Sequence, residues 1–237
     1  MNQQLATISL HHLLIGLLPT VIVIVILFRW TKTARTAIYA NARMLVQLLA
    51  VGYVLTYIFE TNNPWLIVAL VALMVLISAW ISITAFKACG PRDFLYALLA
   101  VALPGLLILG MVTQIILDMT RWFEPRYMVP LAGMILANAM NTVSLSGERF
   151  MAESQRGVGY PDARRVALEA AMIPQFNALF AVGLVALPGM MTGQILSGVD
   201  PLIAVRYQIM VMSMIFGSAG LAAALYLWLL RGDHTEH

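Results

Sequence analysis

Two asparagines inside a long apolar stretch are the first residues whose type and spacing could do chemistry. Asn138 and Asn141 lie within Met128–Leu145, three residues apart, so in a helix they share one face. Polar side chains inside a membrane helix are costly and therefore informative. The pair either hydrogen-bonds across a helix–helix contact or lines a wet pathway, and the sequence favours neither alternative. In both cases the chemistry is hydrogen bonding rather than catalysis.

A second polar set accompanies a proline–glycine pair in the stretch Ile173–Leu196. Its members are Pro188, Gly189, Met190, Met191, Thr192 and Gln194. Because proline removes a helix hydrogen bond and glycine relaxes the backbone, we expect a kink or a break here. Broken membrane helices commonly occur where protein or a water-filled cavity can satisfy the exposed backbone. The alternative is a kink that serves packing alone.

Three further polar residues lie in other apolar stretches. Arg43 and Gln47 are one turn apart in Ile38–Phe59, and Gln208 lies in Leu202–Leu230. The presence of a charged residue at Arg43 in an apolar stretch is explained if its side chain extends to the lipid headgroups. Gln47 lies deeper and needs a partner from another helix. With the two sets above, these residues form our candidate transport path or gate.

The segment Ser146–Met172 is the one long polar connection, and it carries charges of both signs. Its candidate contact residues are Glu148, Glu153, Arg156, Arg164 and Arg165. Two helical pieces are expected on either side of a Gly-Val-Gly-Tyr-Pro break: a short charged helix over Glu148–Arg156, and a helix from about Pro161 into the next apolar stretch. Charge arrangement alone favours a solvated loop. The alternative is a docking surface, with the short helix lying across the membrane face against a soluble partner.

Long apolar stretches must position all of these residues. A membrane-crossing helix needs roughly 20 apolar residues, and only helices or closed barrels satisfy their backbone polar groups in a bilayer. Seven stretches qualify: Leu13–Phe28, Ile38–Phe59, Trp65–Phe86, Phe94–Ile116, Met128–Leu145, Ile173–Leu196 and Leu202–Leu230. We therefore expect an all-α polytopic membrane protein of about seven transmembrane helices, with residues 1–237 as a single transmembrane domain.

Composition and charge support this expectation. Hydrophobic residues make up 61% of the chain and charged residues 11%, with a mean hydropathy of +0.87, whereas a soluble domain carries about 25% charged residues. When the connections are numbered from an outside N-terminus, 11 of the 14 basic residues fall on the inner side and 3 on the outer. Positive residues concentrate on the cytoplasmic side, so the N-terminus is expected outside and the C-terminus in the cytoplasm.

Motifs for catalysis or nucleotide binding are missing from the sequence. There is no GxxxxGK[ST] phosphate loop and no Gly-Lys dipeptide, and no His/Cys/Asp cluster has metal-ligand spacing. The 15 methionines are more often adaptable packing residues than metal ligands, so the chain's metal ligands, if any, are unknown. The net charge of +3 gives no indication of nucleic acid, and we expect no nucleic-acid partner.

Several segments resemble the FetB family of ABC-transporter permeases over nearly the whole chain. The matching segments are Arg43–Leu48, Val51–Val54, Val129–Met140, Val182–Gly193, Ser197–Pro201 and Arg206–Met210. The PGMMTG and SGVDP motifs within them are the most specific.

The resemblance implies a permease subunit that exports iron from the bacterial cytoplasm through the inner membrane. It implies a separate ATP-binding subunit, two copies of each subunit, and no cofactor in this chain, because the partner binds ATP. Residues 146–172 would be the coupling segment, and its movement would pass through the sixth stretch to Pro188 and the asparagine face. Plant relatives are linked to aluminium tolerance and nucleotide-sugar transport. A permease for a nucleotide sugar or lipid, and a non-transporting membrane scaffold, therefore stay open as alternatives.

Overall fold

The computed structural model describes residues 9–60, 63–84, 86 and 90–234. The chain divides into two compact units, Met1–Thr61 and Asn62–His237, and each is described by itself. Lys87, which belongs to the basic residues counted on the inner side, lies outside the described residues.

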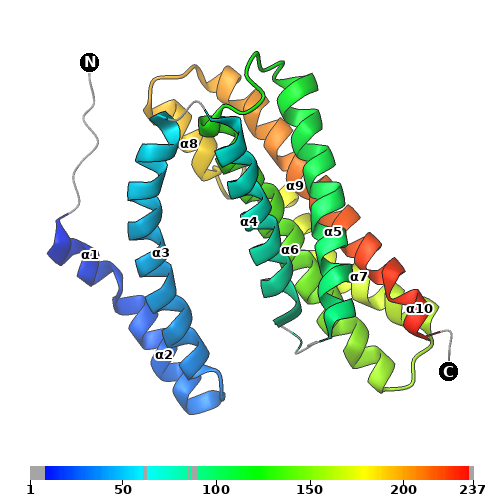
Figure 1. Ribbon diagram of the computed structural model, residues 1–237. Coiled ribbons are helices and arrows are strands. Elements are labelled where there is room, and N and C mark those ends of the chain that lie inside the picture. The colour runs from blue at the N-terminus through cyan, green and yellow to red at the C-terminus, as the bar shows by residue number, and fades with distance from the viewer. Residues whose placement is uncertain (1–8, 61–62, 85, 87–89, 235–237) are drawn as a thin grey trace. The chain divides into compact units, whose positions relative to one another are not determined.

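Unit 1 is a pair of long helices preceded by a short one. Helix α1 spans Leu10–Gly16, α2 spans Leu18–Trp30 and α3 spans Ala34–Glu60. The hydroxyl of Thr31 donates to the carbonyl of Leu27 at 2.9 Å, which satisfies a carbonyl at the end of α2. Helices α2 and α3 pack against one another across this tight connection (Figure 1).

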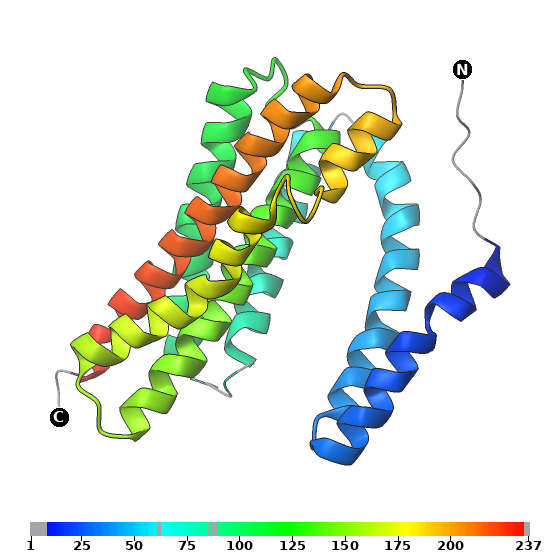
Figure 2. The ribbon, with the colours of Figure 1, turned by 180° about the vertical axis from the view of Figure 1, so that it is seen from behind.

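Unit 2 contains the remaining helices, which run alternately between its two ends (Figures 1 and 2). They are α4 (Pro64–Thr84), α5 (Pro91–Met111), the π-helix η1 (Val112–Ile116), α6 (Pro125–Gln155), α7 (Tyr160–Ala181), α8 (Gly189–Leu196), α9 (Pro201–Leu229) and α10 (Arg231–His234). We call the end where α6 ends and α7 begins the α6–α7 end, and the opposite end the α8–α9 end.

Helix α6 is the centre of unit 2, because it packs against α4, α5, α7 and α9. Small residues make this possible: Ala132 and Ala139 of α6 and Ala222 and Ala223 of α9 are at most 1% exposed. Small side chains let membrane helices approach closely. At Gly147 the approach is closest, since a Cβ there would lie 2.6 Å from the ring of Phe86.

The all-α, polytopic architecture expected from the sequence is confirmed. Within the described residues, six helices are long and apolar enough to cross a membrane. Their bounds agree with six of the seven predicted stretches to within a few residues. The exception is the end of α6, which was predicted at Leu145 and lies at Gln155. The remaining stretch, Ile173–Leu196, is interrupted: α7 ends at Ala181 and α8 begins at Gly189. The predicted break is therefore present.

The prediction of a separate short helix over Glu148–Arg156 was wrong. These residues form the last turns of α6, which is continuous from Pro125 to Gln155. The glycine that could have interrupted the helix, Gly147, is instead a packing site against Phe86. The helix ends at Gln155, two residues before the Gly-Val-Gly sequence, where Gly157 has a φ of +79° that favours glycine.

Candidate functional site

A cavity with several polar side chains in its lining lies among α4, α6, α7 and α9, and we call it the amide cavity. Its volume is about 620 Å³. Its hydrogen-bonding side chains are Thr84, Asn138, Asn141, Thr142, Ser144 and Gln175. The cavity therefore gathers both predicted asparagines together with polar groups from two other helices.

Asn138 is the centre of the hydrogen bonding in this cavity. Its amide nitrogen donates to the carbonyl of Met134 at 2.9 Å, and its oxygen accepts from the amide of Gln175 at 3.4 Å. Gln175 is only 8% exposed. Asn141 lines the same cavity and is exposed. The first alternative of the sequence analysis is thus seen at Asn138, which bonds across a helix contact and also lines the cavity.

A second cavity of about 360 Å³ lies among α7, the break, α8 and α9, and we call it the Gln208 cavity. Met191, Gln208, Met212 and Ser213 are its non-hydrocarbon side chains. Met212 lines the amide cavity too, so this one residue borders both cavities. We refer to the two cavities together as the corridor.

Gln208 has a buried side chain whose amide oxygen lacks a hydrogen-bond partner. The residue is 5% exposed, and its Oε1 atom has no hydrogen-bond partner among the described residues. A buried acceptor left without a partner costs about 1–3 kcal/mol. Groups of this kind call for an explanation such as a bound water or ligand.

The break between α7 and α8 borders the Gln208 cavity and satisfies its own backbone. The amide of Gly183 donates to the carbonyl of Ala186 at 3.0 Å, and the amide of Ala186 donates to the carbonyl of Ala181 at 3.0 Å. Gly183 has a φ of +83°, which an L-side chain rarely adopts. Leu184, at the tip of this turn, is 91% exposed. The turn is therefore compact, with an apolar tip.

The other candidate path residues are spread over two places. Five of them lie at or in α8 and line neither cavity. They are Pro188, which precedes the helix, and Gly189, Met190, Thr192 and Gln194 within it. Arg43 and Gln47 lie on α3 of unit 1 and are described with that unit alone. The structure thus brings four of the predicted residues to the corridor, namely Asn138, Asn141, Met191 and Gln208.

At the α6–α7 end, Glu153 holds two arginines in place. Its side chain is 9% exposed, and its Oε1 lies 2.7 Å from Arg149 and 3.3 Å from Arg156. The carboxylate is therefore directed into the chain rather than toward a partner. Glu148, one turn earlier, is exposed.

Tyr160 fixes the start of α7 to its neighbours. Its hydroxyl donates to the carbonyl of Leu227 at 2.9 Å, and its ring meets the ring of Phe150 at 5.9 Å. The guanidinium of Arg164 lies 5.5 Å from the centre of the same ring. Arg165 faces Asp162 at 3.7 Å and Glu169 at 3.6 Å.

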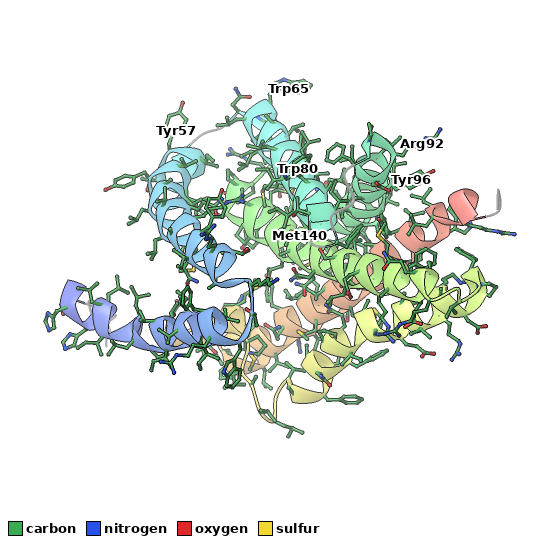
Figure 3. The ribbon with its side chains drawn as sticks, turned by 90° about the horizontal axis from the view of Figure 1, so that it is seen from below. Tyr57, Trp65, Trp80, Arg92, Tyr96 and Met140 are labelled. Carbon is green, nitrogen blue, oxygen red and sulfur yellow. The ribbon has the colours of Figure 1, made fainter. Side chains whose placement is uncertain are left out.

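The start of α7 therefore presents exposed charged side chains and is anchored by the contacts of Tyr160. Arg156, Arg164 and Arg165 are exposed and form what we call the arginine surface. Seen from below, Arg92 also points outward at the start of α5 at this end (Figure 3).

Sequence reasoning missed three residues that matter in this geometry. Gln175 could have been found, because it is a polar residue in an apolar stretch, the criterion that selected Asn138. Met212 lies four residues after Gln208 and so shares its helical face, which is the signal that could have selected it. Tyr160, in contrast, gives no indication that its hydroxyl reaches Leu227, 67 residues along the chain.

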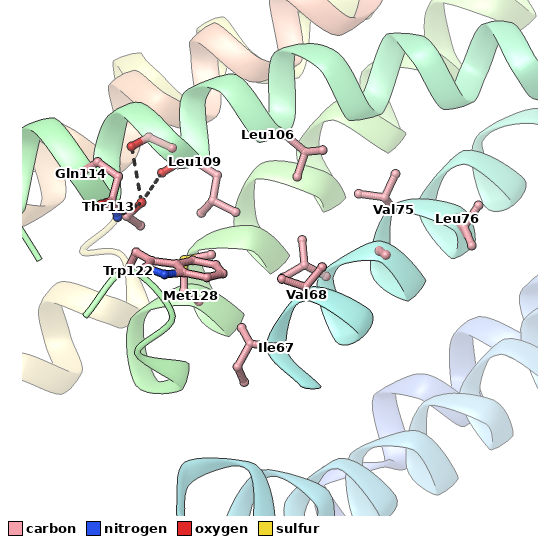
Figure 4. A pocket seen from close by; sticks show the side chains of 13 residues that line it. Ile67, Val68, Val75, Leu76, Leu106, Leu109, Thr113, Gln114, Trp122 and Met128 are labelled. Carbon is pink, nitrogen blue, oxygen red and sulfur yellow. Dashed lines mark hydrogen bonds between the residues drawn. The ribbon is translucent and has the colours of Figure 1, made fainter. Parts of the chain in front are cut away.

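A third cavity, of about 640 Å³, is apolar and lies among α4, α5, η1 and the start of α6. Figure 4 shows mostly hydrocarbon side chains around it, with Thr113 and Gln114 at one end. The hydroxyl of Thr113 donates to the carbonyl of Leu109 at 2.9 Å, and the amide of Gln114 donates to Thr113 at 3.3 Å. These polar groups are satisfied locally, so the cavity offers little beyond apolar contact.

Metal-binding clusters are not found in the part of the chain that the structure describes. No three His, Cys, Asp or Glu side chains come together there. The two corridor cavities contribute amides, hydroxyls and thioethers instead.

Comparison with known proteins gives one family and several relatives. A model described as "Uncharacterised protein family (UPF0014)" matches residues 10–233. The chain is 35% identical over 222 residues to "UPF0014 membrane protein slr1647" of Synechocystis sp., covering 85% of this chain and 83% of that protein. It is 31% identical over 239 residues to "Probable iron export permease protein FetB" of Escherichia coli, covering 93% and 91%.

A plant protein is also similar. "Protein ALUMINUM SENSITIVE 3" of Arabidopsis thaliana is 32% identical over 198 residues, covering 77% of this chain and 71% of that protein. No solved structure matches the chain. Together with the six membrane-spanning helices, these relatives identify a multi-pass protein of the bacterial inner membrane.

Proposed function

We propose that this chain, which belongs to the UPF0014 family of membrane proteins, is the membrane-spanning permease subunit of an ABC transporter. Its cargo would be iron, moved out of the cytoplasm, because a relative that covers 93% of the chain is named a probable iron export permease. ATP would bind to a separate subunit. As the resemblance to ABC-transporter permeases implies, the working complex would hold two copies of each subunit.

The observation that carries the proposal is the course of α7. This helix begins beside the arginine surface, at Tyr160, and its later turns line both cavities of the corridor. Arg164 and Gln175 are 11 residues apart, which is about 16 Å along an α-helix. A push on the arginine surface would therefore be passed along α7 to Gln175 and reach the start of the break after Ala181.

The charge distribution supports a cytoplasmic α6–α7 end. Of the arginines that the structure describes in unit 2, six lie at this end and three at the other. The six are Arg92, Arg149, Arg156, Arg164, Arg165 and Arg231, and the three are Arg121, Arg126 and Arg206. Helices α7 and α8 together run from one end of unit 2 to the other (Figure 2). Counted as one broken crossing, they would add a seventh to the six candidate spans, and the N-terminus would then lie outside.

In the proposed mechanism the corridor opens alternately to the two sides. ATP-driven closure of the partner subunits would displace the arginine surface, and Glu153 would keep Arg149 and Arg156 aligned while the partner is engaged. Movement of α7 against α9 would then change the passage at Met212, which borders both cavities. Hinge motion is favoured at the break, because its backbone bonds are local to the turn.

The test is copurification followed by ATPase measurement. The chain is expressed together with candidate ATP-binding subunits from the same genome and reconstituted in vesicles. We expect a stable complex whose ATPase rate rises with cargo in a panel of iron salts, other metal ions, sugar nucleotides and lipids. Stimulation by a sugar nucleotide or lipid alone would transfer the proposal to that cargo. Failure to bind any ATP-binding subunit would support a non-transporting scaffold instead.

A further inference from the structure

The third cavity, which we call the apolar cavity, has a buried floor and an exposed rim. Val71 and Val75 of α4 and Leu109 of α5 line it and are at most 6% exposed. Leu76 and Leu106, on the same two helices, also line it and are each 46% exposed. The cavity therefore opens on the surface of unit 2 between these helices. Within a bilayer such a surface meets hydrocarbon rather than water.

The length and direction of the apolar cavity match one leaflet of a bilayer. Ile67 and Leu76 both line it and are nine residues apart on α4, which is about 14 Å along a helix. Half of the hydrocarbon core of a bilayer is about 15 Å thick. Ile67 lies three residues after Pro64, where α4 begins at the α8–α9 end (Figure 1). The cavity thus extends from that edge of the membrane toward its middle.

The two ends of the apolar cavity differ in polarity in the same direction. Figure 4 shows Thr113, Gln114 and Trp122 together at one end and Val75 and Leu76 at the other. The polar end is formed by η1 and the connection to α6, so it lies at the α8–α9 end. Tryptophan is enriched where a membrane meets water, because its ring is apolar and its N–H group is polar. A phospholipid has the same arrangement, with a polar headgroup at the membrane edge and hydrocarbon toward the middle.

An apolar cavity of this size calls for an apolar occupant. Its volume of about 640 Å³ lies within the range of roughly 300–1,000 Å³ in which pockets hold organic ligands. Apolar cavities exclude water, and an empty one deprives its lining of van der Waals contacts. Acyl chains are the apolar groups that surround a membrane helix at this depth.

We propose that the apolar cavity binds one acyl chain of a membrane phospholipid from the leaflet at the α8–α9 end, with the headgroup beside Gln114 and Trp122. The acyl chain lies between α4 and α5 and fills the hollow that these helices leave. The site belongs to unit 2 and shares no lining residue with the amide cavity or the Gln208 cavity. Binding of the lipid does not depend on which cargo the protein carries.

Gly110 offers a way to fill the cavity without disturbing the fold. It lines the cavity, and a Cβ there would meet no atom within 4 Å. Gly110→Leu should leave the unfolding temperature without lipid unchanged or higher, because leucine also favours a helix more than glycine does. It should weaken lipid binding about tenfold or more, since keeping two methylene groups out of the cavity is worth about that factor.

Gly193→Leu is the matched control. Gly193 also lies in a helix, and a Cβ there would likewise meet no atom within 4 Å. It lines none of the three cavities. The same substitution at this position should therefore leave lipid binding unchanged.

The experiment counts the phospholipids that the full-length protein retains. The protein is purified in a steroid-based detergent, which carries no acyl chain, and native mass spectrometry gives the bound lipid and the oligomeric state. We expect one firmly held phospholipid per chain in the wild-type protein and in Gly193→Leu, and its loss in Gly110→Leu. Dioleoyl phosphatidylethanolamine added to delipidated wild-type protein should raise the unfolding temperature. The dihexanoyl form, with the same headgroup and short chains, should not.

Four results would overturn the inference. They are a wild-type protein that retains no phospholipid, equal retention by Gly110→Leu, an equal response to the dihexanoyl lipid, and a change of oligomeric state in Gly110→Leu with its lipid retained. The last result would show that a second copy of the chain covers the cavity. If Gly110→Leu fails to fold, Ala72→Leu fills the cavity from α4 and is judged by the same outcomes.

Discussion

Exchanging Arg164 and Arg165 together for glutamate is expected to abolish cargo-dependent ATPase activity while the helices stay folded. Both side chains are exposed at the start of α7, and that start is held by Tyr160 through Leu227 and Phe150. In the proposed complex, acidic groups of the partner face these two arginines. Two glutamates in their place should weaken docking about a hundredfold, since like charges across an interface cost several kcal/mol. The measurements are pull-down of the ATP-binding subunit and ATPase rate in vesicles.

The matched control reverses two arginines at the opposite end of unit 2. Arg126→Glu with Arg206→Glu changes the net charge by the same amount and lies at the α8–α9 end, where no docking is proposed. It should retain the complex and its stimulation by cargo. Equal loss in both double variants would point to a general charge effect, and full activity of the Arg164/Arg165 variant would remove the arginine surface from the mechanism.

The second large effect is expected at the bond between α6 and α7. Asn138→Leu removes the acceptor of Gln175 and a polar group of the amide cavity, and Gln175→Leu removes the donor. Each change should lower the rate of transport about tenfold, because a buried polar group is left without its partner. The double variant should be little worse than either single variant, since both act on one contact. Cargo uptake into inside-out vesicles measures the rate.

Asn177→Leu provides the control for these variants. Asn177 lies on α7, two residues after Gln175, and lines neither cavity of the corridor. Its replacement should leave transport unchanged. Additive losses in the Asn138/Gln175 double variant would show that the two amides act separately, and the coupling of α6 to α7 at this contact would then be discarded.

The sequence predicts the membrane helices well because their signal is local. Each is a long apolar run, and the runs alone placed six helices to within a few residues, apart from the extended α6. The break in Ile173–Leu196 was also predictable, since Pro188 and Gly189 disfavour a continuous helix. The start of α7 near Pro161 followed from the same local rules.

The contacts that define the site depend on distant parts of the chain. Asn138 was selected by its polarity, but its bond to Gln175 joins residues 37 positions apart. Glu153 was predicted as a contact with the partner. Its ion pairs with Arg149 and Arg156 are local to the helix, but its low exposure of 7% depends on the packing of distant parts of the chain. The end of α6 was mispredicted because the apolar run stops at Leu145, whereas the helix continues through the charged residues to Gln155.

The central claim is that the arginine surface faces the cytoplasm, where an ATP-binding subunit can drive α7. It is tested most directly by labelling single cysteines with a membrane-impermeant maleimide, after Cys89→Ser removes the native thiol. Gln155→Cys reports on the α6–α7 end, and Thr120→Cys reports on the α8–α9 end. The account predicts that intact cells label Thr120→Cys, and that Gln155→Cys is labelled only in inside-out vesicles. Labelling of Gln155→Cys in intact cells would contradict it.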